Sequence, residues 1–418
     1  MTMNAKRRRA HQKLAALPGV RSVRRPVRDG SDEEFDLYYV RSGRKTRRPL
    51  VVIPGGPGAA SVGLYRGFRR RAAAAGLDVV MIEHRGVGMS RHDDAGNDLP
   101  PDALTIERVV DDVVAVLDDA QVEAAILYGT SYGTYIAAGV GVVHPHRVHA
   151  MILDSPLLSN RDIEDVRGAI RETLWDGNRL ETAQLAPKMR RLVGDGLLAP
   201  SAGQLAAVMY GLGGAELLNR QLDLLLDGRR WLWTGLNHFA RLLFSRKAPY
   251  RNEADLVGRI GYRELNYGGV PDGKPLDPAV AFREFFGGAG DFEAEPYDLV
   301  AEMPKFSWPS VVVSGSRDLT TPTSVAKNIA ALVPDAVLVR LATAGHSALD
   351  SRERAALEIA KAVRDGHTQQ LAGRAAQLDA LPGPRLVRLF IGAIRAAAAV
   401  EGALPSAVPR VVARVTTS

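Results

Sequence analysis

The sequence predicts an α/β fold, with a mostly parallel central sheet, helices on both of its faces and an inserted helical segment. Two observations lead to this prediction. Short apolar runs alternate with helical patterns over residues 50–157 and again over 304–366. Between these stretches the chain has helical patterns and loops but no convincing strand. Strands that alternate with helices indicate parallel βαβ units, so the middle stretch is expected to be an insertion into one α/β body.

These patterns divide the 418 residues into four parts. We predict a body formed by residues 20–157 and 304–366, which is interrupted by a helical cap at 158–303. A basic N-terminal extension is expected at 1–19 and an Ala/Arg-rich C-terminal extension at 367–418. A chain of this length suits one large domain with an insertion.

The net charge of +7 comes from the two ends of the chain. Residues 1–49 hold 14 Lys/Arg against 5 Asp/Glu, and 367–418 hold 6 against 2, which leaves 50–366 at −6. No aromatic residue interleaves the basic cluster at 6–9, so a nucleic-acid partner is not expected. No continuous apolar run follows the cluster, and none approaches the roughly 20 residues of a membrane span. A cytoplasmic enzyme without a transmembrane segment is therefore the expectation.

Two further features limit the possibilities. The chain has no cysteine, which excludes a disulfide framework, a thiolate metal site and a cysteine nucleophile, and we predict neither a metal nor a cofactor. In the C-terminal extension, Leu386, Leu389, Phe390 and Ile394 have amphipathic helical spacing. Such a stripe is expected to pack against its own body rather than on a membrane.

The first elements of the body lead into a glycine-rich loop. Residues 20–49 are expected to form an entry hairpin, with Ser42-Gly43 as its turn. Leu50–Ile53 is a short apolar run that ends at Pro54-Gly55-Gly56-Pro57-Gly58, which predicts a buried parallel strand feeding a tight loop. Because glycine lets the backbone approach a bound group closely, this loop could supply backbone donors to a substrate. No Lys-Ser/Thr follows it, so a nucleotide-binding P-loop is not expected.

The central motif is Gly129-Thr130-Ser131-Tyr132-Gly133. It follows the apolar run 124–128 and precedes an Ala/Gly-rich helical pattern. A serine on a sharp strand-to-helix turn needs neighbours with almost no side chain at positions −2 and +2, and both are glycine here. The context predicts that Ser131 is a nucleophile, with the amide of Tyr132 as one oxyanion donor. An ordinary glycine-rich turn is the alternative.

A serine nucleophile needs a base and an acid that orients the base. Asp318 follows the predicted strand 310–314, and His346 follows the predicted strand 336–341. Ser131, Asp318 and His346 thus occur in the chain order expected for this topology, each at the carboxyl end of a strand. Asp154, also at a strand end, is the rival acid and is expected to be structural.

Taken together, PGGPG at 54–58, RGVGMS at 85–90, GTSYG at 129–133 and GSRDLTTP at 315–322, followed by His346, resemble the α/β-hydrolase superfamily. Within it they resemble the prolyl iminopeptidase and tripeptidyl aminopeptidase group of serine peptidases. The resemblance implies the α/β-hydrolase fold with a helical cap over the site. It also implies that the amides of Gly56 and Tyr132 form the oxyanion hole.

The same resemblance implies a counter-charge in the cap for a substrate's α-ammonium group, and Glu264 is the candidate. The chain departs from the group in having Pro54 before the glycine loop and Glu83-His84 before Arg85-Gly86. These departures leave the subgroup and the substrate open. The function expected is a serine aminopeptidase that cleaves N-terminal residues of peptides. A hydrolase of small esters, lactones or amides is the alternative, and a non-enzymatic binding protein is a third. The oligomeric state is left open.

Overall fold

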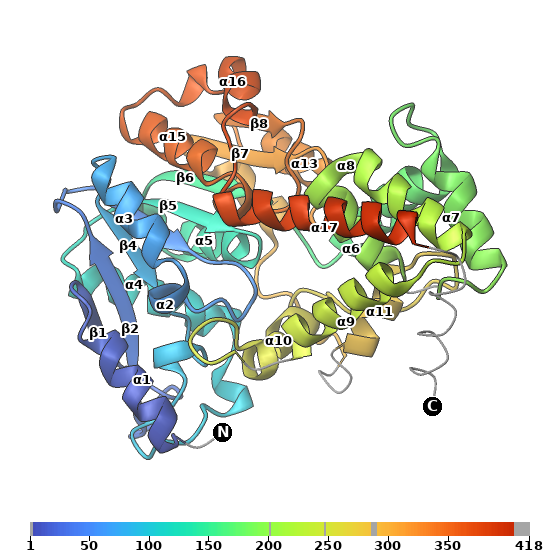
Figure 1. The fold of residues 1–418 in the computed structure, drawn as a ribbon. Coiled ribbons are helices and arrows are strands. Elements are labelled where there is room, and N and C mark those ends of the chain that lie inside the picture. The colour runs from blue at the N-terminus through green and yellow to red at the C-terminus, as the bar shows by residue number, and fades with distance from the viewer. Residues whose placement is uncertain (1–2, 200–201, 246–247, 286–290, 405–418) are drawn as a thin grey trace.

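The computed structural model describes residues 3–199, 202–245, 248–285 and 291–404 (Figure 1). Within them a single sheet of eight strands has the order β1-β2-β4-β3-β5-β6-β7-β8. The first two pairings, β1 with β2 and β2 with β4, are antiparallel, and the remaining pairings are parallel. The strands are β1 (Val20–Pro26), β2 (Glu34–Ser42), β3 (Leu50–Ile53), β4 (Val79–Ile82), β5 (Ala125–Thr130), β6 (Val148–Asp154), β7 (Ser310–Gly315) and β8 (Ala336–Leu341).

Helices cover both faces of this sheet, as predicted. The helices outside the insertion are α1 (Ala5–Ala15), α2 (Ser61–Leu64), α3 (Arg66–Ala74), α4 (Ile106–Asp119), α5 (Tyr132–Val143), α13 (Thr323–Leu332), α14 (Ala348–Ser351), α15 (Glu353–Arg364), α16 (Ala375–Asp379) and α17 (Arg385–Ala403). One hydrophobic cluster joins α4, α5 and α13 to one sheet face, and a second joins α3, α15 and α16 to the other.

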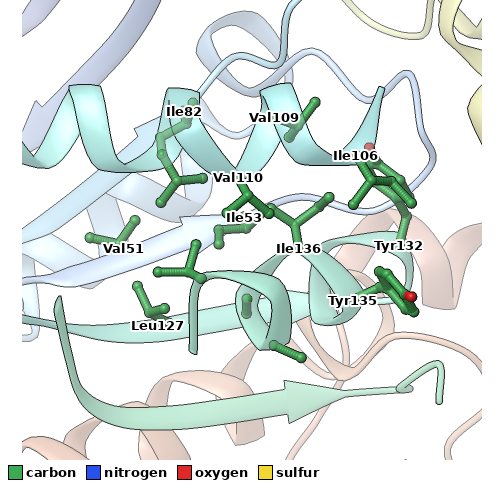
Figure 2. Packing of buried hydrophobic residues seen from close by; sticks show 14 of the residues in the cluster. Val51, Ile53, Ile82, Ile106, Val109, Val110, Leu127, Tyr132, Tyr135 and Ile136 are labelled. Atoms are coloured by element: carbon green, nitrogen blue, oxygen red, sulfur yellow. The ribbon is translucent and has the colours of Figure 1, made fainter. Parts of the chain in front are cut away.

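The strands serve both clusters because their side chains alternate between the two faces. In β3, Val51 and Ile53 belong to the first cluster, whereas Leu50 and Val52 belong to the second. Figure 2 shows Val51 and Ile53 lying among side chains of α4 and α5. All four β3 residues are buried, which explains why the strand appears in the sequence as a continuous apolar run.

A helical insertion lies between β6 and β7. It contains α6 (Asp162–Arg171), α7 (Leu185–Gly194), α8 (Gly203–Leu226), α9 (Trp231–Ser245), α10 (Ala254–Arg263), α11 (Pro278–Phe285) and α12 (Leu299–Glu302). It has its own hydrophobic cluster, which is built mainly from α6, α7 and α8 and also includes Leu319 from the body and Ile394 and Ala398 from α17. The insertion and the C-terminal helix are therefore packed as one unit.

The N-terminal residues differ from expectation in the position of the hairpin turn. The hairpin turn lies at 27–33 between β1 and β2, so the prediction of a turn at Ser42-Gly43 was wrong. Ser42 instead ends β2 opposite Val79 of β4. The basic cluster belongs to α1, in which Arg7 is buried while Arg8 and Arg9 are exposed. The Arg7 guanidinium donates to Glu253 of the insertion (3.0 Å) and to the carbonyl of Gly88 in the body (2.8 Å).

The C-terminal residues form α16, which packs beside β8, and α17, which crosses α8 and α9 (Figure 1). The expectation that the α17 stripe packs against its own protein was wrong for Leu386 and Leu389. Ile394 is buried, but Leu386 and Leu389 are 80% and 69% exposed and Phe390 is 38% exposed. The contacts of α17 are centred on Ile394 and Ala398, with Phe390 at their edge against Phe239 of α9. Among the described helices none is long and apolar enough to cross a membrane.

Candidate active site at the carboxyl edge of the sheet

Ser131 lies on the sharp turn between β5 and α5. Its backbone has φ 51° and ψ −123°, a conformation that non-glycine residues rarely adopt and that costs about 1–3 kcal/mol. The glycines at positions −2 and +2 are required by close packing. A Cβ on Gly129 would collide with the carbonyl of Gly133, and one on Gly133 would collide with the carbonyl of Ile53. The strand–turn–helix geometry that the sequence predicted is therefore present, and the role of Ser131 as nucleophile remains a prediction.

The glycine-rich loop after β3 lies against this turn. A Cβ on Gly55 would lie 3.0 Å from the carbonyl oxygen of Thr130 and 3.1 Å from the Cβ of Ser131, so a larger residue would crowd the turn. Gly56 has φ 129°, which a side chain would strain. Tyr132 is the first residue of α5, where backbone N–H groups have no acceptor within the helix. The loop that contains Gly56 and the start of the helix at Tyr132 thus both adjoin Ser131, and the role of these two amides as oxyanion donors remains a prediction.

His84 supports this loop, although the sequence singled it out only as a departure from a pattern. It is 2% exposed, its Nε2 lies 3.3 Å from the carbonyl oxygen of Pro54, and its ring packs edge-on against Tyr132 at 5.6 Å. Burial lowers the pKa of His84 to about 4, so the ring is neutral near pH 7. A neutral imidazole can donate from Nε2 to Pro54, which fixes the start of the glycine loop.

Asp318 and His346 are brought together by the loops after β7 and β8. His346 Nδ1 lies 2.9 Å from Asp318 Oδ2. The other carboxylate oxygen accepts from the amides of Thr320 (2.8 Å) and Thr321 (2.9 Å), and the Thr321 hydroxyl donates to Oδ2 (2.8 Å). The Asp318 side chain is fully buried, whereas that of His346 is 33% exposed. The carboxylate is therefore held in one orientation, with the imidazole facing the more open side.

Each member of this pair shifts the pKa of the other. Burial alone would raise the pKa of Asp318, but the neighbouring His346 and the amides of Thr320 and Thr321 hold it below its usual value. Burial alone would lower the pKa of His346, but the Asp318 carboxylate raises it above 6.5 overall. The pair therefore favours an ionised aspartate beside an imidazole whose pKa is higher than usual.

Hydrogen bonds from the ends of β5 and β6 hold the loop that carries His346 next to the turn that carries Ser131. The Thr130 hydroxyl donates to Ser347 Oγ (3.0 Å), and the Ser347 amide donates to Ser155 Oγ (2.9 Å). Asp154 accepts from the amides of Ala348 (2.9 Å) and Leu349 (2.8 Å) at the start of α14. Residues 130–131, 154–155, 318 and 346–347 thus meet at one edge of the sheet.

Asp154 and Ser155 are positioning residues that the sequence did not identify as such. Asp154 is 1% exposed and also accepts from the Tyr128 hydroxyl (3.0 Å). Burial raises the pKa of Asp154 to about 6, although its hydrogen bonds oppose that shift. The expectation that this aspartate is structural agrees with these contacts. Its position at a strand end was visible in the sequence, but its partners near residue 348 were not.

The carboxylate of Glu264 is hydrogen-bonded to groups of the protein itself. Glu264 follows the last residue of α10, is 7% exposed, and accepts from the amide of Ile106 (2.8 Å) and from the Arg263 guanidinium (3.1 Å). Ile106 begins α4, so the carboxylate satisfies a free amide at a helix N-terminus. Burial raises the pKa of Glu264, and these two partners oppose the shift. Burial raises the pKa of the Tyr132 phenol, and the negative charge of Glu264 raises it further. Its amine-binding role remains a prediction.

The insertion touches both loops of the Asp318–His346 pair through a glycine-rich segment of α8. This helix is kinked at Gly214, which has φ 73°, and a Cβ there would lie 2.8 Å from the Arg317 guanidinium carbon. A Cβ on Gly345 would lie 2.6 Å from the carbonyl oxygen of Gly211. The position of α8 therefore constrains the residues immediately before Asp318 and His346.

A cavity of about 590 Å³ lies between α6 and the loop after β7. Its lining carries both signs of charge. Glu164, Asp165 and Glu172 lie on one side, where Arg179 pairs with Glu172 (2.7 Å), and Lys327 and Arg340 also contribute. Asp318 contributes to the lining, but neither Ser131 nor His346 does. This cavity is therefore not placed to hold a bond that Ser131 would attack.

Comparison with known proteins agrees with the fold. Residues 48–194 match the family model described as alpha/beta hydrolase fold. The chain is 22% identical to the proline iminopeptidase of Neisseria meningitidis serogroup A over 334 residues, which cover 78% of this chain and 93% of that protein. It is 23% identical to the proline iminopeptidase of Neisseria gonorrhoeae over 333 residues, with the same coverage.

Two solved structures align over most of the chain at TM-scores below 0.5. The proline iminopeptidase of Mycobacterium smegmatis has a TM-score of 0.46 and 17% identity, covering 86% of this chain and 99% of its own. Est816, described as an N-acyl homoserine lactone degrading enzyme, has a TM-score of 0.45 and 19% identity, covering 78% of this chain and 96% of its own.

Proposed function

The chain has the α/β-hydrolase fold, and from this fold and the residues at its strand ends we propose that the protein is a serine hydrolase that forms an acyl-enzyme on Ser131. The observation that carries the proposal is the convergence of the strained Ser131 turn with the loop of the His346–Asp318 pair, joined by the hydrogen bond from Thr130 to Ser347. In this proposal Ser131, His346 and Asp318 are a catalytic triad, and the helical insertion is a cap that covers them.

The chemistry follows from the two ring nitrogens of His346. Because Nδ1 faces Asp318 Oδ2, Nδ1 carries the proton and Nε2 is left to accept the proton of the Ser131 hydroxyl. Ser131 Oγ attacks the substrate carbonyl, and the amides of Gly56 and Tyr132 stabilise the oxyanion. The imidazolium then gives its proton to the leaving group as the acyl-enzyme forms. Water, activated by the same nitrogen, hydrolyses the acyl-enzyme and restores Ser131.

An aminopeptidase is the substrate class we propose first. The relatives named proline iminopeptidase favour it, and Glu264, buried near Tyr132, is the acid we assign to the α-ammonium group of a peptide. One observation favours the alternative, an esterase, lactonase or small-amide hydrolase. The carboxylate of Glu264 is already paired with the amide of Ile106 and with Arg263, so binding an amine would require it to share or exchange a partner.

A matched pair of substrates separates these alternatives. Prolyl-naphthylamide and N-acetyl-prolyl-naphthylamide share a scissile bond and differ in the free amine, while p-nitrophenyl butyrate has no amine. An aminopeptidase cleaves the first far faster than the second, and Glu264→Gln reduces that preference while sparing the ester. Equal rates on both naphthylamides, with faster ester hydrolysis, would replace the aminopeptidase with the alternative. A Glu264→Gln enzyme that keeps its preference for the free amine would refute the role of Glu264.

The serine hydrolase itself is tested by a fluorophosphonate probe. Wild type should be labelled, Ser131→Ala should not, and Ser316→Ala, which changes a serine on the loop before Asp318, should be labelled as wild type. An unlabelled wild type would refute the proposed chemistry and favour a binding protein of the same fold.

A further inference from the structure

The C-terminal helix α17 and α9 form an antiparallel pair on the outside of the helical insertion. Glu401, near the end of α17, accepts from the amides of Trp231 (2.9 Å) and Leu232 (3.3 Å) at the start of α9. Further along, the rings of Phe239 and Phe390 lie 6.1 Å apart. Figure 1 shows α17 lying in front of helices of the insertion and crossing them.

The outward side of this pair is apolar. On α17, residues 386, 389, 393, 396 and 400 recur at intervals of three and four, which places them on one side of a helix, and all five are Leu, Ala or Val. They lie opposite the side that packs through Ile394 and Ala398. We define the outer face of α9 and α17 by its exposed large apolar side chains, which are Trp231, Phe239, Leu386, Leu389, Phe390 and Val400.

The exposed charges that α17 itself carries beside the outer face are basic. Arg385, Arg388 and Arg395 lie on the exposed part of α17, and residues 380–400 contain no Asp or Glu. Within the part of the chain that the structure describes, Arg395 pairs with Glu216 through a long, exposed contact of 3.6 Å. Glu401 follows the stretch but is 1% exposed and occupied by the amides of α9. The apolar stripe is thus accompanied by three positive charges that its own helix does not balance.

This charge distribution distinguishes between two occupants. A second copy of the chain docked helix to helix would bring two sets of three arginines together with no acidic residues on either α17 to pair with them. An anionic lipid surface supplies the opposite charge, and arginines flanking a Leu/Phe/Trp face are the composition that binds such surfaces. We propose that the outer face of α9 and α17 docks on an anionic lipid bilayer. Because no described helix can span a membrane, the pair would lie on the surface.

The experiment uses the full chain and vesicles of phosphatidylcholine, with or without about 30 mol% phosphatidylserine, because anionic headgroups supply the attraction. Wild type should sediment with the anionic vesicles, bind the neutral ones at least ~10-fold more weakly, and lose binding as salt rises. The variant Leu386→Glu/Leu389→Glu should lose binding. Arg388→Gln/Arg395→Gln should bind on the order of 25-fold more weakly, from about five-fold per arginine.

Leu180→Glu is the matched control, since Leu180 is 99% exposed in the insertion but lies outside the outer face, and it should bind as wild type. All variants should melt cooperatively near the wild-type temperature, because the changed side chains are exposed. Trp231 is a built-in reporter. Its emission should shift to the blue with anionic vesicles, and Trp231→Phe should remove most of that change. Ser131→Ala should bind vesicles as wild type, so the outcome is independent of the proposed hydrolase.

Two results would overturn the proposal. The first is equal binding, or no binding, to anionic and neutral vesicles. The second is a wild-type dimer in light scattering that Leu386→Glu/Leu389→Glu converts to a monomer, in a protein that does not bind anionic vesicles. That result would assign the outer face to a second copy of the chain.

Discussion

The contact between α8 and the loop of His346 predicts that Gly345→Ala impairs the site without touching a reacting group. The new Cβ would lie 2.6 Å from the carbonyl oxygen of Gly211, where ordinary contacts begin near 3.4 Å. Both groups belong to the backbone, so neither can move aside by changing a rotamer. The new Cβ and the Gly211 oxygen must therefore move apart by about 0.8 Å, through a shift of α8 or of the loop.

The size of the effect follows from this shift. Overpacking of a tight contact costs about 1–3 kcal/mol of folding stability. A displacement approaching 1 Å at a catalytic group costs on the order of 10²-fold in rate. If half of the required shift falls on the His346 loop, we expect kcat/KM to fall roughly 10- to 100-fold. The matched control is Gly168→Ala on α6, where a Cβ would meet nothing within 4 Å and helix propensity favours alanine.

The assay is the rate of fluorophosphonate labelling together with ester or naphthylamide hydrolysis, compared with thermal melting. Gly345→Ala should be slow in both assays and less stable, whereas Gly168→Ala should keep wild-type activity and be as stable or more so. If Gly345→Ala reacts as fast as Gly168→Ala, the insertion does not constrain His346 and the reasoning fails.

Three further predictions concern the residues around the site. Asp318→Asn should slow hydrolysis by about 10⁴-fold. His346 acts as a base only when it is neutral, and Asp318 raises the pKa of His346 above 6.5, so wild-type activity should rise with pH through a midpoint above 6.5. Asp318→Asn should lower that midpoint, and an unchanged pH profile would contradict the pairing. Asp154→Asn loses one of two amide bonds to α14, so about 1–3 kcal/mol of stability and part of the activity should be lost. Arg7→Ala removes the guanidinium that pairs with buried Glu253, which would keep the amide of Gly88 (2.6 Å) and a 3.9 Å contact with Arg91, and it should cost about 3–5 kcal/mol in chemical unfolding. Exposed Arg8→Ala should change stability by less than about 0.5 kcal/mol.

The sheet and the Ser131 turn could be predicted because their signals are local. A buried strand such as β3 appears as four apolar residues in a row, and the turn needs glycine at two fixed positions around Ser131. Asp318 and His346 could be predicted for a different reason. Parallel strands place their carboxyl ends at one edge of a sheet, so chain order alone predicts that the residues after β7 and β8 meet there.

The residues that hold the site together could not be predicted because their partners are distant in the chain. Asp154 binds amides 194 and 195 residues later, and Arg7 binds Glu253 across 246 residues. In the sequence, Arg7 cannot be told from Arg8 and Arg9, since all three belong to one basic cluster and only the packing of α1 buries one of them. The stripe on α17 presents the same difficulty, because amphipathic spacing gives an apolar side without saying which side meets the protein.

One helix links the outer face to the candidate site, and this arrangement makes a last prediction. Helix α8 packs against α17 on the outside of the insertion and meets Gly345 and Arg317 through its glycine-rich segment. A bilayer that restrains α17 therefore also restrains the helix that limits the position of His346. Anionic vesicles should change the rate at which Ser131 is labelled by the fluorophosphonate probe, and neutral vesicles should not. Leu386→Glu/Leu389→Glu should show the same labelling rate with and without anionic vesicles. If that variant responds to the vesicles as wild type does, the lipid acts on the probe or on another surface, and the link through α8 is wrong.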